Sequence, residues 1–304
     1  MSPLPSDGTA AIPRRAIPSR PARSRAVAIL RTLLRQNIVS LAAEIIVVVL
    51  LFVGVFGPVL APHDPLATDV LARLTPPALG HPFGTDQLGR DVYSRVLFGT
   101  RATLLTVVFV LALVLALGIP LGAIAGFVEG WADEVIMRIG DLILAFPPLV
   151  LAMALVVAMG PSLTTAMLAV AIVRWPRYAR LVRAQVLTIK HRPYVEAEQS
   201  LGGSQARTIV RHILPNCLDP VLVRATVDAG YIILTTASLS FIGLGAQPPS
   251  PEWGAMVSDA RAYMINNWWV GVYPGVAIML AVTGLTLVGD EIRDRFDPTL
   301  RGVR

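Results

Sequence analysis

The chain has 304 residues, of which 54% are hydrophobic and 15% are charged, and its mean hydropathy is +0.64. Soluble domains average about 25% charged residues, so this composition excludes an ordinary soluble domain and indicates a polytopic membrane protein. The formal net charge is +6, but the basic residues follow the predicted membrane topology and do not indicate nucleic-acid binding. A single cysteine, Cys217, excludes an intrachain disulfide framework and a multi-cysteine metal site.

The N-terminal region is basic and then becomes strongly apolar. Residues 1–40 contain seven arginines and several prolines, and we expect a disordered cytoplasmic tail. Residues 41–61 form the first predicted transmembrane helix, because about 20 apolar residues cross the hydrocarbon layer. A cleaved signal peptide is the alternative, since residues 59–61 resemble a cleavage site, but the apolar run exceeds the usual length of about 7–15 residues.

Residues 62–101 form a predicted extracytoplasmic segment that ends in a charged stretch. This stretch contains Asp86, Arg90, Asp91 and Arg95. Asp91 and Arg95 are four residues apart and could form an ion pair on one helix. Docking of a soluble partner on the four charged side chains is the alternative hypothesis.

Residues 102–292 contain five further apolar segments. We expect spans at about 102–127, 139–159, 163–173, 220–244 and 272–288. The segment at 163–173, which would be the fourth span of the chain, is a weak span candidate because Arg174, Pro176 and Arg177 follow it. It is either a short, kinked span or a re-entrant segment. Six spans in an all-α membrane protein are the favoured interpretation.

A regular glycine pattern marks the second predicted span. Gly118, Gly122 and Gly126 are four residues apart and expose backbone on one helix face, while Pro120 is expected to kink the helix. This pattern indicates close packing with a neighbouring helix, either within the chain or in another subunit.

The distribution of lysine and arginine predicts the orientation. With the N-terminus inside, the inner segments carry 20 of the 26 basic residues. The positive-inside rule therefore predicts that both the N-terminal tail and the tail at 293–304 are cytoplasmic.

The inner segment 190–216 predicts two short helices joined by a turn. Pro193 suits the start of the first helix, and Gly202 and Gly203 break it. Ser204 can cap a second helix, which we expect Pro215 to end. An apolar stripe is predicted along this second helix, at Ala206, Ile209, Val210, Ile213 and Leu214. Such an elbow could insert into a groove of a partner protein or lie on anionic lipid.

Asp228 falls within the fifth predicted span, where a lipid-facing carboxylate would be costly. It either lines a pathway or pairs with Arg224, four residues earlier on the same helix face; pairing is slightly favoured.

The sequence lacks the motifs of several kinds of active site. Lys190 is the only lysine and follows Ile189, so the chain has no G-x-x-x-x-G-K-[ST] phosphate loop. The four histidines lie on different sides of the membrane or in different segments, without metal-ligand spacing, so we expect no metal site; they are His63, His81, His191 and His212. No nucleophile–base constellation is recognisable, so catalysis by this chain is not expected.

The elbow resembles the E-A-A-x3-G-x9-I-x-L-P loop of ABC-importer permeases. The matching residues are Glu196-Ala197-Glu198, Gly202 and Ile213-Leu214-Pro215, although Glu198 replaces the second alanine and His212 takes the place of an isoleucine. Further motifs are similar to the C-type permease of the dipeptide/oligopeptide/nickel transporter family. They include HPFGTDQLGRDVYSR at 81–95, DLILAFP at 141–147, YARLVRAQVL at 178–187 and SLSFIGLG at 238–245.

The resemblance covers about residues 40–302 and implies a type I ABC importer permease fold. It implies a first span followed by a five-helix core, in the plasma membrane of a prokaryote. The implied partners are a homologous second permease, two ATP-binding cassette ATPases and an extracytoplasmic solute-binding protein. No cofactor would be bound by this chain, whereas ATP and magnesium would be bound by the ATPases.

The resemblance also assigns candidate sites. The predicted ATPase-coupling residues are Tyr194, Glu196, Ala197, Ser200, Leu201, Gly202 and Gly203. Asp86, Arg90, Asp91 and Arg95 would dock the binding protein. Asp228 and Thr236 are candidate pathway residues, but Thr236 stands where this family often has glutamate, so that glutamate's role does not transfer.

Two other functions remain as alternatives. A self-sufficient channel or secondary transporter would need ionisable residues in several spans or inverted repeats, and only Asp228 suggests this. A membrane scaffold could use the elbow only to recruit a soluble partner. Di- or oligopeptides are the expected substrate class, while nickel chelates, haem and glutathione also belong to the family's range.

Overall fold

The computed structural model describes residues 38–202 and 204–296. The predicted N-terminal tail up to residue 37, Gly203 and the C-terminal tail from residue 297 lie outside the described residues. The described residues form helices and contain no β-strand, only isolated bridges at Ala78–His81 and Thr85–Asp91. The predicted all-α fold is confirmed for this part of the chain.

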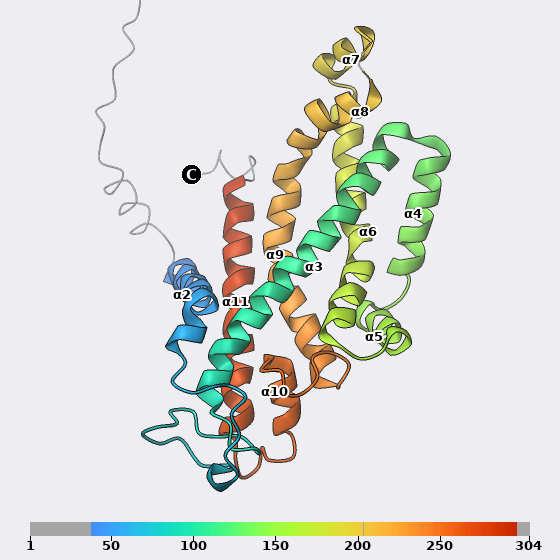
Figure 1. Cartoon of the computed structure of the whole chain (residues 1–304). Helices are drawn as coiled ribbons and strands as arrows, with labels where there is room; N and C mark the ends of the chain where they lie inside the picture. Colours follow the sequence, from blue (N-terminus) through green and yellow to red (C-terminus); the bar gives the residue numbers. More distant parts are fainter. Residues whose placement is uncertain (1–37, 203, 297–304) are drawn as a thin grey trace, which may run out of the picture. The chain divides into compact units, whose positions relative to one another are not determined.

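The helices follow one another along the described chain with short connections. Their bounds are α2 Ile38–Leu60, η1 Val70–Ala72, α3 Val92–Val128, α4 Gly130–Leu144, α5 Pro148–Met159, α6 Leu163–Lys190, α7 Pro193–Ser200, α8 Gln205–Thr208, the π-helical turn η2 Ile209–Ile213, α9 Leu214–Phe241, α10 Trp253–Ala260 and α11 Trp269–Phe296. Figure 1 shows α7 and α8 at one end of the bundle, and α10 with the segment between α2 and α3 at the other.

Three of the described helices are long and apolar enough to cross a membrane, namely α2, α3 and α11. The pair α4 and α5 also passes this test, but the two helices meet at 94°, so they form a broken span or a re-entrant loop. Helices α6 and α9 each have 28 residues, or about 42 Å of helix, and are therefore long enough to cross a membrane. They do not meet the same hydropathy criterion, because they contain charged and polar residues.

The structure corrects two of the predicted spans. The third span is interrupted between Leu144 and Pro148, because Pro147 and Pro148 lack backbone N–H donors and disfavour helix in the residue before them. The fourth segment does not end near residue 173, since α6 continues to Lys190 through Pro176. Its basic residues are accommodated by acidic partners: Arg183 pairs with Asp133 at 2.5 Å, and Arg180 pairs with Asp141.

The glycine face of α3 packs against α6. A Cβ atom on Gly122 would lie 2.4 Å from the carbonyl oxygen of Ala179, and one on Gly126 would lie 2.9 Å from that of Arg183. Gly118 lies similarly close to the side chain of Tyr178. The glycines therefore permit backbone contact between α3 and α6, which confirms packing within the chain as their role.

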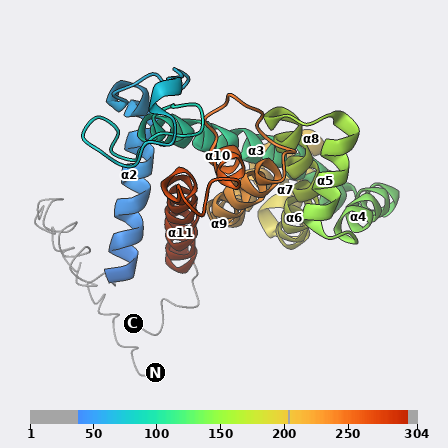
Figure 2. The same cartoon turned by 90° about the horizontal axis from the view of Figure 1, so that it is seen from below.

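Helix α2 packs at the edge of the bundle. Gly57 on α2 lies against the backbone oxygen of Leu97 in α3, and Gly284 on α11 lies against Ile46 in α2. Figure 2 shows α2 beside α11, on the side away from α4, α5 and α6. Most of the apolar surface of α2 remains exposed, including Val48 and Val55, as expected for a helix that meets lipid.

We predict that Gly122→Ala lowers the free energy of unfolding by about 1–3 kcal/mol, because the new methyl group overlaps the backbone of α6. Denaturant unfolding of the purified chain in one detergent measures the change. Gly275→Ala on α11 is the matched control, since a Cβ atom there meets nothing within 4 Å. Equal stability of Gly122→Ala and the control would contradict close α3–α6 packing.

Candidate functional site

The elbow between α6 and α9 is built as two short helices around a glycine turn. Helix α7 ends with Leu201 N–H donating to Ala197 O at 3.1 Å, and Gly202 then adopts a φ of +83°, which favours glycine. Ser204 caps α8, because its side-chain oxygen accepts a hydrogen bond from Arg207 N–H. These features agree with the predicted helix–turn–helix arrangement.

The predicted coupling residues lie on the outer surface of this elbow. Six of them are described and exposed, namely Tyr194, Glu196, Ala197, Ser200, Leu201 and Gly202. Leu201 is 86% exposed, which is unusual for a large apolar side chain and leaves it available to a partner. Val195 and Ile213, both 0% exposed, hold the elbow against the bundle. Gly203 lies outside the described residues, and the coupling role of the set stays a prediction.

One sequence expectation about the second elbow helix is wrong. Pro215 does not end it, because the chain continues from α8 through the π-helical turn into α9, where Pro215 occupies the first turn and needs no N–H donor. Along the predicted apolar stripe, Ile213 is buried within the chain, whereas Ala206 and Val210 are exposed.

Asp228 lies buried between two helices and pairs with two arginines. Its carboxylate is 3.3 Å from Arg224 on the same helix and 3.6 Å from Arg174 on α6. The predicted pairing with Arg224 is thus present, but the sequence did not reveal Arg174. The Arg174 guanidinium also lies over the ring of Tyr231, 3.8 Å from its centroid. Asp228 and Arg174 therefore connect α6 to α9.

Thr236, the other candidate pathway residue, is also buried. Its hydroxyl donates to the carbonyl oxygen of Ile232 at 2.8 Å, one turn earlier on α9. This bond satisfies the hydroxyl within its own helix.

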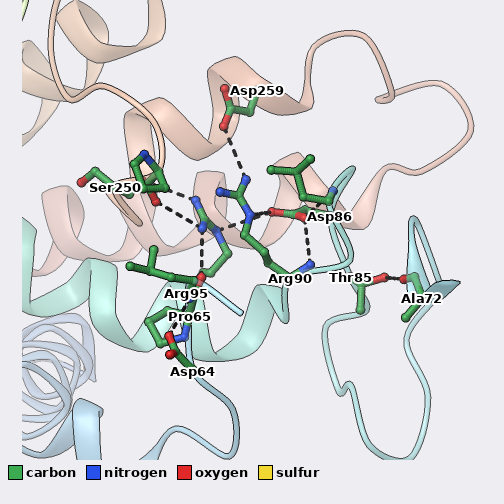
Figure 3. Close-up of polar contacts among 12 residues, drawn as sticks. Asp64, Pro65, Ala72, Thr85, Asp86, Arg90, Arg95, Ser250 and Asp259 are labelled. Atoms are coloured by element: carbon green, nitrogen blue, oxygen red, sulfur yellow. Dashed lines mark hydrogen bonds and ion pairs between the residues drawn. The ribbon is translucent and has the colours of Figure 1, made fainter. Parts of the chain in front are cut away.

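The charged stretch before α3 forms a buried cluster with α10, which we call the charge cluster and define as Asp86, Arg90, Arg95 and Asp259. Arg90 Nε donates to Asp86 Oδ2 at 2.6 Å, and its Nη2 atom lies 3.9 Å from Asp259 Oδ2. Arg95 Nε is 3.7 Å from Asp86 Oδ2 (Figure 3). Asp86 thus forms ion pairs with both Arg90 and Arg95.

Arg95 also connects three chain segments through hydrogen bonds. Its guanidinium donates to the carbonyl oxygens of Pro65, Pro249 and Ser250 at 3.0–3.4 Å, as Figure 3 shows for Pro65 and Ser250. Trp253 adds a further link, since its indole N–H donates to Val96 O at 3.0 Å. The 62–91 segment, the start of α3 and the connection before α10 are therefore held as one layer.

The predicted functions of the charged stretch need correction. Asp86, Arg90, Asp91 and Arg95 are each only 1–3% exposed, so they offer a soluble partner almost no surface, and direct docking on these side chains is not supported. The predicted pairing of Asp91 with Arg95 is wrong. Asp91 instead caps α3 by accepting from Ser94 N–H at 2.8 Å, while the acidic partner of Arg95 is Asp86.

Two carboxyl groups around α10 have raised pKa values. Burial raises the pKa of Asp259, and the nearby charges of Arg90 and Arg95 oppose this effect. Burial likewise raises the pKa of Glu252, although the N–H groups of Gly254 and Ala255 donate to its carboxylate and favour the charged form. Glu252 thereby caps α10.

The expectation that the histidines lie apart is wrong for two of them. The rings of His63 and His81 stack with centroids 4.8 Å apart, and His81 Nδ1 lies 2.9 Å from Asp91 Oδ1. The three residues are separated in sequence, so spacing rules for local metal motifs could not find them. They come together because the 62–91 segment folds back over the start of α3.

We predict that Asp228→Asn lowers the free energy of unfolding by about 3–5 kcal/mol, because it leaves the buried guanidinium of Arg174 without a counter-charge. Arg224→Gln is the matched control and costs at most about 1 kcal/mol, since its side chain is 44% exposed and Arg174 still neutralises Asp228. Denaturant unfolding in one detergent compares the two, and equal losses would contradict the central role of the Arg174–Asp228 pair.

Comparison with known proteins places the chain in a family. Residues 118–302 match the family model for the binding-protein-dependent transport system inner membrane component. Residues 29–77 match the N-terminal TM domain of oligopeptide transport permease C. A chain of the MetNI methionine ABC transporter, in an inward-facing conformation, superposes with a TM-score of 0.53 over 69% of this chain and 96% of its own length at 18% identity, which supports the fold.

Individual relatives align along most of their length. The "Probable D,D-dipeptide transport system permease protein DdpC" of Escherichia coli K12 is 47% identical over 270 residues, which cover 89% of this chain and 91% of the relative. The dipeptide permease DppC of Alkalihalophilus pseudofirmus is 40% identical, covering 88% of each chain. The glutathione permease GsiD of Escherichia coli O6:K15:H31 is 42% identical, covering 88% and 89%. The chain therefore belongs to the family of binding-protein-dependent transport system inner membrane components, and it is the membrane permease subunit of an ABC importer.

Proposed function

We propose that this permease forms half of the pathway of an importer for dipeptides or similarly small peptides, and that an ATPase drives it through the α7–α8 elbow. The observation that carries the coupling role is the elbow's construction. Its six described contact residues are exposed at one end of the bundle, whereas Val195 and Ile213 are buried beneath them and anchor it. A rigid, anchored protrusion can transmit a push from a partner into the helices that it joins.

The elbow is continuous with α6 on one side and with α9 on the other. The Arg174–Asp228 pair connects these two helices farther along the bundle. A displacement of the elbow would therefore move α6 and α9 as a pair. Such a coupled movement is what a permease needs to convert closure of an ATPase into a change of pathway access.

The proposed assembly needs four further proteins. Two ATPases would bind ATP and magnesium, because this chain has a single lysine, Lys190, and no phosphate loop around it. A homologous permease would provide the second half of the pathway, and an extracytoplasmic binding protein would deliver the solute. Exposed apolar side chains along α3, such as Leu105 and Val108, would meet lipid or the second permease.

The proposed substrate class rests on the relatives. Those named for D,D-dipeptide, dipeptide and glutathione transport are 40–47% identical to this chain. These solutes are small peptides or peptide-like molecules. A self-sufficient carrier remains the alternative that the uptake experiment below also tests.

We further propose six spans with both termini in the cytoplasm. In addition to α2, α3, the broken pair α4–α5 and α11, the spans are α6 and α9. The last two are long enough, and their buried charges Arg174 and Asp228 neutralise each other, which reduces the cost of placing them in a bilayer. This arrangement places the elbow on the cytoplasmic side and the charge cluster outside, in agreement with the excess of basic residues in the inner segments.

Cysteine labelling tests this orientation. On a Cys217→Ser background, Leu79→Cys and Leu201→Cys introduce thiols at two highly exposed positions in different segments. We expect a membrane-impermeant maleimide to label Leu79→Cys in spheroplasts and to label Leu201→Cys only after permeabilisation. Labelling of Leu201→Cys in intact spheroplasts would contradict the cytoplasmic elbow.

ATP-driven uptake tests the coupling role. The permease, its partner permease and both ATPases are reconstituted in proteoliposomes with the binding protein and a labelled dipeptide. We expect Gly202→Asp to insert normally but to reduce uptake per ATP hydrolysed at least about tenfold, because the side chain strains the positive φ of the turn and adds charge to the contact surface.

Gly160→Asp is the matched control for this substitution. Gly160 has a φ of +90° and open space around it, so it carries the same backbone strain in the connection between α5 and α6. Normal uptake by Gly202→Asp, or an equal loss in both variants, would count against the coupling role. Uptake by the permease without ATPases would support a secondary carrier instead.

A further inference from the structure

A histidine pair and a buried carboxylate meet beside the start of α3. Each of His63, His81 and Asp91 offers one ligand atom, and these atoms all lie within 4.8 Å of one another. The side chain of Asp91 is fully buried, whereas those of His63 and His81 are 42% and 29% exposed. The carboxylate is thus fixed inside the fold, while the imidazoles are open to solvent.

The charge of Asp91 calls for a positive partner. In the part of the chain that the structure describes, its ion pairs are both with histidines, at 2.9 Å to His81 and 3.8 Å to His63, and these are charged only when protonated. Hydrogen bonds from the N–H and hydroxyl of Ser94, at 2.8 and 2.6 Å, stabilise the carboxylate but bring no net charge. A bound metal cation would supply a positive charge that does not depend on protonation.

The donor set matches a particular class of metal. Two imidazoles and a carboxylate are ligands for Zn²⁺ and related divalent transition metals, and three protein ligands leave a fourth position for water. Tetrahedral ligation with metal–ligand bonds of about 2.0–2.2 Å separates the donor atoms by about 3.3 Å. Rotation of the two part-exposed rings can bring donors now up to 4.8 Å apart to this spacing.

The backbone restricts where the two histidines can lie. His81 precedes Pro82, which restricts the backbone of His81 towards extended conformations. The backbone N–H of His63 also donates to Ser94 Oγ at 3.1 Å, which ties it to the first turn of α3. The fold therefore positions the backbone of both histidines before any ion binds, and only their rings need to rotate.

We propose that His63, His81 and Asp91 form a binding site for one divalent transition-metal ion of the Zn²⁺ class, which joins the segment after α2 to the start of α3. The binding replaces the contact between His81 and Asp91 and needs both imidazoles neutral. This site is independent of the elbow and of the proposed substrate.

Cobalt(II) and zinc(II) are the probes for this site. The full-length chain carries an affinity tag without histidine, is stripped with a chelator and is placed in nanodiscs. We expect Co²⁺ to produce the visible absorption of tetrahedral cobalt at one ion per chain, and Zn²⁺ to displace it. We also expect Zn²⁺ to raise the thermal unfolding midpoint of the wild-type chain.

The variants separate the site from non-specific binding. His63→Ala and His81→Ala should each weaken Zn²⁺ binding at least about tenfold. Asp91→Asn should also weaken it while preserving the helix cap, because asparagine is a good N-cap residue. His191→Ala, at an exposed histidine outside the cluster, is the matched control and should bind as the wild type does. Absence of a bound ion in the wild-type chain, or unchanged binding by the His63→Ala/His81→Ala double variant, would overturn the proposal.

Discussion

Arg174 and Asp228 face each other between α6 and α9, and placing these two helices side by side in an apolar bundle depends on this contact. A charged side chain within an apolar bundle is costly unless an opposite charge accompanies it. Arg174 interrupts the apolar character of α6, and Asp228 does the same for α9, so each helix compensates the other. The same rule applies at the charge cluster, where Asp86 and Asp259 together balance the charges of Arg90 and Arg95.

The two ends of the bundle are stabilised by different interactions. At the elbow, the buried apolar side chains of Val195 and Ile213 anchor a surface on which Tyr194, Glu196 and Leu201 are exposed. At the opposite end, the 62–91 segment has little regular structure and is held by Arg95, which donates to the carbonyl oxygen of Pro65 (Figure 3). Trp253 donates to the carbonyl oxygen of Val96 and thereby links α10 to α3. In the proposed mechanism, an ATPase displaces the elbow, whereas the layer at the opposite end stays in place.

Sequence reasoning succeeded where the signal is local. The glycine turn at Gly202 and the cap at Ser204 were predictable, because the conformational preferences of these residues act within a few positions. The spacing of Gly118, Gly122 and Gly126 showed a close contact but could not show whether the neighbour lay in the same chain. The length of α6 was missed, since its arginines resemble a solvent-exposed end until their partners Asp133, Asp141 and Asp228 are known.

The sequence by itself determined the membrane class, the all-helical fold, the family resemblance and the elbow, because composition, helix signals and contiguous motifs are properties of neighbouring residues. Apart from the Arg224–Asp228 pair, only the tertiary structure decided which charges are paired and which distant groups meet. Asp86 is nine residues from Arg95 and far from Asp259 in the chain, and His63 reaches His81 and Asp91 only when the 62–91 segment folds over α3. Such contacts depend on how distant segments pack, and no local pattern encodes that packing.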